Sequence, residues 1–124
     1  MGYLEDKLTE KIIGCIIKVH RTLGPGFMES VYQRALVIEF RKAGLQVQME
    51  REYAVKYEGE IVGRHRLDIL VEGKVVVELK TVKLLSTFHF AQARAYLKAT
   101  GLRAAVLVNF SCAMADFRRI ELQA

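Results

Sequence analysis

The sequence predicts an α/β domain with a mixed central β-sheet flanked by helices, in the order α-α-β-β-β-α-β. Three observations predict it: helical periodicity before residue 44, period-two alternation over residues 47–80, and a last helical segment that leads into a continuous apolar run. Short turns join antiparallel strands whereas a helical crossover joins parallel ones, so one sheet should contain both pairings. The chain has 124 residues and no linker rich in proline, glycine or serine, so we expect a single domain over residues 1–124.

Two helices are expected at the start of the chain. Apolar side chains recur at steps of three and four over residues 4–23, and the Gly-Pro-Gly segment at residues 24–26 then ends the helix. A second helix is expected over residues 27–43, with Gly44 as its C-terminal cap. The core side of this second helix should carry Val31, Tyr32, Ala35, Leu36, Ile38 and Phe40.

The strands of the sheet are recognised by alternation and by glycine-containing turns. They are expected at residues 47–57, 61–71, 74–80 and 104–110. The first strand is expected to be interrupted near Glu50 and Arg51. A helix over residues 86–100, ending at Gly101, separates the third strand from the fourth, and residues 117–122 are expected to add a short edge strand.

The composition favours a polyanionic partner and excludes several classes of protein. The net charge is +5, which favours nucleic acid among possible ligands. Two cysteines, Cys15 and Cys112, are too few for four-cysteine iron–sulfur ligation, and as buried small residues they fit a reduced compartment. The chain shows no signal-peptide pattern and no apolar run of membrane-spanning length, so we expect a cytoplasmic protein. Basic side chains gather around the later elements: Arg64, His65, Arg66, Lys83, Arg94, Lys98, Arg103, Arg118 and Arg119.

Two carboxylates and an amine interrupt the apolar strands of the second hairpin. If the strands pair through the turn at residues 72–73, Asp68 and Glu78 meet on one side of the sheet, and Lys80 lies on the same face as Glu78. Unpaired carboxylates in apolar surroundings cost several kcal/mol each, so something should compensate them. A hard divalent cation would do so. The alternative is a structural ion pair between Lys80 and one of the carboxylates.

The spacing of these residues resembles a known catalytic motif. Asp68 followed by Glu78, Leu79 and Lys80 is similar to the D…(D/E)-x-K core of the PD-(D/E)XK nuclease superfamily. The residue before Asp68 is Leu67 rather than proline, at a position where the superfamily varies.

Two further motifs extend the resemblance. The segment GFMESVY, residues 26–32, resembles the signature of the small GxxExxY protein family. The segment HFAQARAYL carries Gln92 and Tyr96, similar to the Q-xxx-Y motif of RecB-type nucleases. The resemblance covers residues 8–122 and implies a restriction-endonuclease-like core.

The resemblance implies a metal-dependent nuclease, in which Asp68, Glu78 and the backbone carbonyl of Leu79 hold Mg²⁺ or Mn²⁺. Glu29, expected in the first turn of its helix, would complete the site directly or through water. Lys80 would orient or help deprotonate the attacking water.

The expected substrate is nucleic acid, with DNA favoured over RNA. Gln92 and Tyr96 are expected to position the strand, and His89 and Arg94 to contact substrate. By resemblance, in-line attack would leave a 5′-phosphate and a 3′-hydroxyl. A homodimer would help so small a protein embrace a duplex.

Two alternatives to a nuclease stay open. The chain could be a nuclease-like module or regulatory subunit that holds nucleic acid or a partner protein without cutting. It could also be an α/β domain whose acids form surface ion pairs, which predicts no stabilisation by metal.

Overall fold

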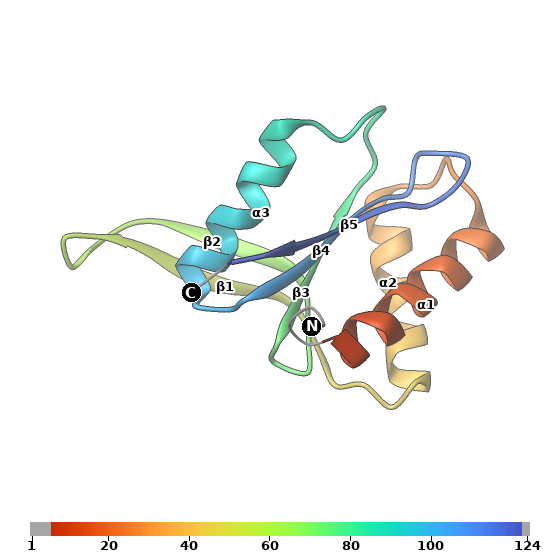
Figure 1. Ribbon diagram of the computed structural model, residues 1–124, viewed down its shortest axis with the longest axis horizontal. Helices are drawn as coiled ribbons and strands as arrows, with labels where there is room; N and C mark the ends of the chain where they lie inside the picture. Colours follow the sequence, from red (N-terminus) through yellow and green to blue (C-terminus); the bar gives the residue numbers. More distant parts are fainter. Residues whose placement is uncertain (1–5, 123–124) are drawn as a thin grey trace.

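The computed structural model describes residues 6–122, and within them three helices flank one five-stranded sheet (Figure 1). The elements are α1 (Asp6–Leu23), α2 (Glu29–Lys42), β1 (Val47–Tyr57), β2 (Glu60–Val71), β3 (Val75–Lys80), α3 (Thr87–Thr100), β4 (Ala104–Asn109) and β5 (Asp116–Glu121). The predicted α/β class and the restriction-endonuclease-like order of elements are confirmed. The expected start of the first helix at Leu4 lies outside the described residues.

The sheet is mixed, as expected. Its strand order is β1-β2-β3-β4-β5; β3 and β4 are parallel, and every other neighbouring pair is antiparallel. The crossover through α3 creates the parallel pair. The expected strand at the C-terminal end is present as β5, which pairs with β4.

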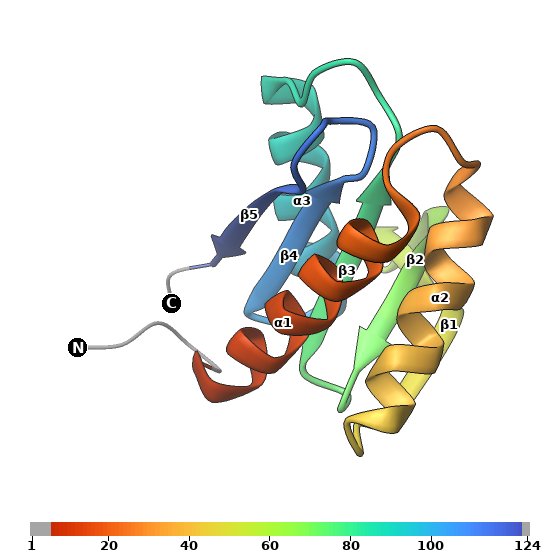
Figure 2. The ribbon, with the colours of Figure 1, turned by 90° about the vertical axis from the view of Figure 1, so that its right-hand side faces the viewer.

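The two faces of the sheet are covered by different helices. Figure 2 shows α1 and α2 side by side on one face and α3 behind the sheet on the other. The side chains of β3 alternate between the two faces of the sheet. Val75, Val77 and Leu79 pack under α1 and α2, whereas Val76 packs under α3. Glu78 therefore lies on the α3 face. All four of these apolar side chains are fully buried, so both faces of β3 are closed to solvent at these positions.

Strands β1 and β2 extend well beyond the rest of the sheet. They pair from Val47 and Val71 to the turn between Tyr57 and Glu60, with an irregularity at Val55 and Lys56. In contrast, β3 pairs with β2 only at residues 69–71. The remainder of the hairpin projects as a two-stranded arm, visible in Figure 1 beside α3.

The core side of α2 is narrower than the sequence predicts. Tyr32, Leu36 and Phe40 are fully buried, but Val31 and Ile38 are 37% and 58% exposed. The prediction of a core role for these two residues is wrong because the buried side of α2 carries Val37 together with Tyr32, Leu36 and Phe40, and Val31 and Ile38 lie on the other side of the helix. Ile38 instead lines a shallow groove of about 160 Å³ between the two helices.

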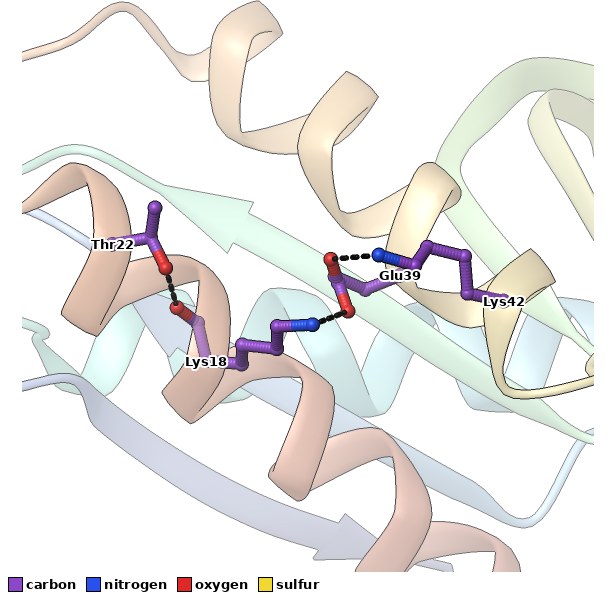
Figure 3. Close-up of polar contacts among 4 residues, drawn as sticks. All are labelled: Lys18, Thr22, Glu39 and Lys42. Atoms are coloured by element: carbon purple, nitrogen blue, oxygen red, sulfur yellow. Dashed lines mark hydrogen bonds and ion pairs between the residues drawn. The ribbon is translucent and has the colours of Figure 1, made fainter.

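An ion-pair cluster on the surface joins α1 and α2 (Figure 3). Glu39 lies 3.0 Å from Lys18 and 3.8 Å from Lys42, and the Thr22 hydroxyl donates to the Lys18 carbonyl at 2.8 Å. Hydrogen bonding to Lys18 lowers the pKa of Glu39. Both lysines are exposed, so the cluster contributes little to stability.

The two cysteines and His20 contribute to packing and to local hydrogen bonding. Cys15 is buried as expected, whereas Cys112 is only half-buried because it lies in the turn after β4, and both are free thiols. His20 is buried and its Nε2 lies 2.8 Å from the Cys112 carbonyl, so it is a satisfied core histidine. None of the helices described between residues 6 and 122 is long and apolar enough to cross a membrane.

Candidate metal centre

Asp68 and Glu78 lie where β2 and β3 separate. Regular pairing ends at Ile69 and Val77, and at the next position side chains replace the backbone ladder. Glu78 Oε1 accepts from the Asp68 N–H at 3.3 Å, and Asp68 Oδ2 accepts from the Leu79 N–H at 2.8 Å. The expected proximity of the two carboxylates is therefore confirmed, and each is fixed by the backbone of the other strand.

The surroundings of this pair disfavour its negative charge. Glu78 is 3% exposed, and burial, together with the charge of Asp68, raises its pKa to about 9. Burial also raises the pKa of Asp68, while the Leu79 N–H and the charge of Lys80 act in the opposite direction. At neutral pH the pair therefore needs a proton or a cation. Carboxylate oxygens such as those of this pair are the ligands that Mg²⁺ and Mn²⁺ prefer.

The backbone carbonyl of Leu79 faces the same opening. In a strand, the N–H and C=O of one residue point to the same edge. The Leu79 N–H points towards Asp68, so its carbonyl does too. The next carbonyl, that of Lys80, points the other way and accepts from the Phe110 N–H at 3.0 Å.

Helix α2 approaches the pair from the opposite face of the sheet. Glu29 is its first residue, and Gln33, one turn later, donates from Nε2 to the Asp68 carbonyl at 2.9 Å. Partial burial and the charge of Asp68 raise the pKa of Glu29, and Lys80 opposes them. Within residues 6–122, however, no three His, Cys, Asp or Glu side chains come together as a cation-binding group. Glu29 is thus near the pair but apart from it.

The GxxExxY segment explains how Glu29 is placed. Gly24 and Gly26 adopt φ of +69° and +113°, which other residues rarely adopt. The buried Tyr32 hydroxyl donates to the Gly24 carbonyl and accepts from the Phe27 N–H at 3.2 Å. The Tyr32 ring stacks on Phe110 at 4.3 Å. Tyr32 therefore fixes the loop from which α2 starts, as a core residue that supports the site.

Lys80 is held by the Q-xxx-Y helix. Its Nζ donates to Gln92 Oε1 at 3.0 Å. Tyr96, one turn after Gln92, is 9% exposed, and burial raises its pKa, with smaller contributions from Glu78 and Asp68. Gln92 and Tyr96 are thus brought to the carboxylate pair and Lys80.

The surroundings of His89 and Arg94 differ from those of Gln92 and Tyr96, and their expected contact with substrate stays a prediction. His89 Nδ1 accepts from the Ser86 N–H at 2.9 Å, so His89 caps the start of α3. Arg94 is exposed and lies two residues after Gln92, about 200° further round the helix. The structure does not group either residue with Lys80.

Three polar residues near the site were not predicted: Gln33, Asn109 and Glu50. Asn109 is fully buried beside Lys80, where its Nδ2 donates to the Val82 carbonyl at 2.8 Å and its Oδ1 accepts from the Val82 N–H at 3.2 Å. It fixes the segment that follows Lys80. Glu50 has a left-handed φ of +54°, and its charge raises the pKa of Asp68. The predicted interruption of β1 is a local irregularity at Glu50, because the strand continues through it.

The signals for these residues differ. Gln33 follows Glu29 at helical spacing, so the two share one face of α2. Asn109 is the polar end of an apolar run, a position where a buried amide must have partners.

Comparison with known proteins gives one family match. The model described as the PD-(D/E)XK nuclease superfamily matches residues 6–120. No curated protein matches the chain. A solved structure described as "Crystal structure of SSO0001" is similar with a TM-score of 0.61 and 18% identity, over 77% of this chain and 50% of that one. This chain therefore spans half the length of that protein, and at this identity the similarity shows the fold alone.

Proposed function

The chain belongs to the PD-(D/E)XK nuclease superfamily, as its motifs predict, and from this premise we propose that it is a divalent-metal-dependent nuclease acting on DNA. The observation that carries the proposal is the Asp68–Glu78 pair where β2 and β3 separate, with Glu78 buried, Asp68 half-buried and Lys80 beside them. A structural ion pair explains this arrangement less well, because within residues 6–122 no ion pair joins Lys80 to Asp68 or Glu78, and its ammonium donates to Gln92.

The donor set fits a hard cation. Asp68, Glu78 and the Leu79 carbonyl would hold Mg²⁺ or Mn²⁺, and Glu29 would act through water, since it stands apart from the pair. When bound, the cation would stabilise negative charge on the phosphate and make water a better nucleophile. Asp68 is half-buried, so the pair remains accessible from solvent.

Lys80 would stabilise charge that develops in the reaction. Its half-buried ammonium is pinned at 3.0 Å by Gln92, which aims it before substrate arrives. There it can hydrogen-bond the attacking water or a phosphate oxygen. Tyr96, one turn further along α3 and buried, would act as a positioning residue.

Glu29 would hold a water, and not the cation itself, at the edge of the site. Its raised pKa keeps it able to exchange a proton nearer to neutral pH than an ordinary glutamate. The bond from Gln33 to the Asp68 carbonyl couples the position of α2 to that of β2. By analogy with the superfamily, the products would carry a 5′-phosphate and a 3′-hydroxyl.

The test is cleavage of labelled single- and double-stranded DNA with Mg²⁺, with Mn²⁺ and with EDTA. Glu78→Gln and Lys80→Ala should each lower the rate by about 100-fold or more while leaving the fold intact. The controls Glu10→Gln and Lys11→Ala make the same chemical changes on the exposed side of α1 and should cut like wild type. Absence of metal-dependent cutting in wild type would contradict the proposal and favour a non-cleaving binding module.

A further inference from the structure

A second feature of the α3 face lies away from the carboxylates. A cavity of about 560 Å³, open on one side, lies between the C-terminal half of α3 and the β1–β2 arm. Its lining consists of small apolar side chains, among them Ala54, Ala95 and Ala99, which we call its floor, and of the polar side chains of Lys56, His65 and Lys98, which we call its wall. We call it the arm–helix pocket. Its volume falls in the range of pockets that hold small organic ligands.

The pocket is connected to the catalytic lysine by a chain of contacts. The His65 ring, in the pocket wall, lies 4.5 Å from the ring of Tyr96. Tyr96 lies one turn after Gln92 on α3, and Gln92 in turn accepts a hydrogen bond from Lys80. A ligand in the pocket therefore lies on the same helix face as the site.

The spacing between the two matches a short stretch of nucleic acid. Gln92 and Ala99 are separated by two turns of α3, a rise of about 10 Å. A stacked strand of B-form DNA rises about 3.4 Å per charge and an unstacked strand rises more, so the pocket is at most about three nucleotides from Lys80 along a strand that follows the helix.

The pocket has the charge and shape for one nucleotide. Both lysines are exposed, and no described carboxylate between residues 6 and 122 forms an ion pair with either. They can therefore contact phosphate oxygens. The alanine floor offers apolar surface to a base or sugar. In a duplex the bases are paired and stacked inside, so only an unpaired nucleotide can reach that floor.

We infer that the arm–helix pocket binds one unpaired nucleotide of the substrate, at most about three positions from the cleaved bond, with its phosphates on Lys56 and Lys98. This inference rests on the proposed nuclease function and specifies its substrate: nucleic acid with a single-stranded segment. Blunt duplex would be bound through phosphates alone.

The test measures binding without cutting. In the Glu78→Gln background with EDTA, fluorescence anisotropy compares a labelled single strand with a blunt duplex of the same sequence. Ala95→Leu fills the pocket from an exposed helical position and changes no charge. It should weaken single-strand binding by about tenfold, comparable with the loss of one base contact, and leave duplex binding unchanged. Lys56→Ala and Lys98→Ala should each lower the salt slope on single strands by about 0.7.

The controls separate this inference from the nuclease proposal. Lys11→Ala removes the same charge from α1 and should leave single-strand binding and its salt slope as in the parent. Melting temperatures of all variants verify folding. The inference is overturned if the Ala95→Leu variant binds single strands with the affinity of its parent. It is also overturned if the substitution lowers the affinities for single strand and duplex equally. Failure of wild type to cut would instead contradict the nuclease proposal, because the binding assay does not depend on cleavage.

Discussion

Glu78 should make the stability of the metal-free protein fall as pH rises. Its pKa is about 9 in the folded protein and near the ordinary 4.5 in the unfolded chain. Between these values the folded state holds one more proton than the unfolded state. The free energy of unfolding therefore falls by about 1.4 kcal/mol per pH unit, or about 2.7 kcal/mol from pH 6 to pH 8. Total stabilities of single domains are about 5–15 kcal/mol, so the loss is measurable.

The substitution Glu78→Gln isolates this effect, because glutamine resembles the neutral carboxyl and does not titrate. Urea unfolding in EDTA at pH 6, 7 and 8 should show the variant gaining on wild type by up to about 2.7 kcal/mol across the series. Asp68 has a pKa raised in the same direction, but it is present in both proteins. The exposed control Glu10→Gln should track wild type. Parallel stability curves for wild type and Glu78→Gln would refute the reasoning.

Three further predictions concern the metal and the residues that support the site. Mg²⁺ should raise the melting temperature of wild type, and more at pH 8 than at pH 6, because the ion competes with the proton on Glu78. It should not raise the melting temperature of Asp68→Asn. Equal shifts in both proteins, measured by scanning calorimetry, would place the metal elsewhere. Asn109→Ala should cost about 2–3 kcal/mol in urea unfolding, because it leaves the Val82 N–H and carbonyl without their partner; a cost below about 0.5 kcal/mol would show that water replaces the amide. Tyr32→Phe should cost about 1 kcal/mol and lower the cleavage rate, because the Gly24–Phe27 loop that positions Glu29 loses its hydroxyl; unchanged cleavage would mean that the loop position does not matter.

The elements and the acidic pair could be predicted because they depend on short-range periodicity. Alternation along β2 and β3 is enough to bring Asp68 and Glu78 together once the turn between the strands is recognised. The family motif likewise placed Glu29 in the first turn of α2. The resemblance to the GxxExxY family itself stays a prediction.

The remaining features depend on packing that no local pattern specifies. Val31 and Ile38 are apolar and lie at helical spacing, yet they are exposed because the buried side of α2 is the other one, which carries Val37. His89 follows the stripe of Gln92 and Tyr96, but its ring turns back to cap α3. The arm–helix pocket requires residues of β1, β2 and α3 at once, and only the tertiary register brings them together.

The most direct test of the central claim, that Asp68 and Glu78 form a metal site, is calorimetric titration with Mn²⁺ at pH 8. Wild type should bind one ion and release up to one proton, which is measured as a dependence of the binding heat on the ionisation enthalpy of the buffer. Glu78→Gln should bind the ion at least 10-fold more weakly and release no proton. The control Glu10→Gln should match wild type. Absence of binding to wild type, or equal binding to Glu78→Gln, would contradict the claim.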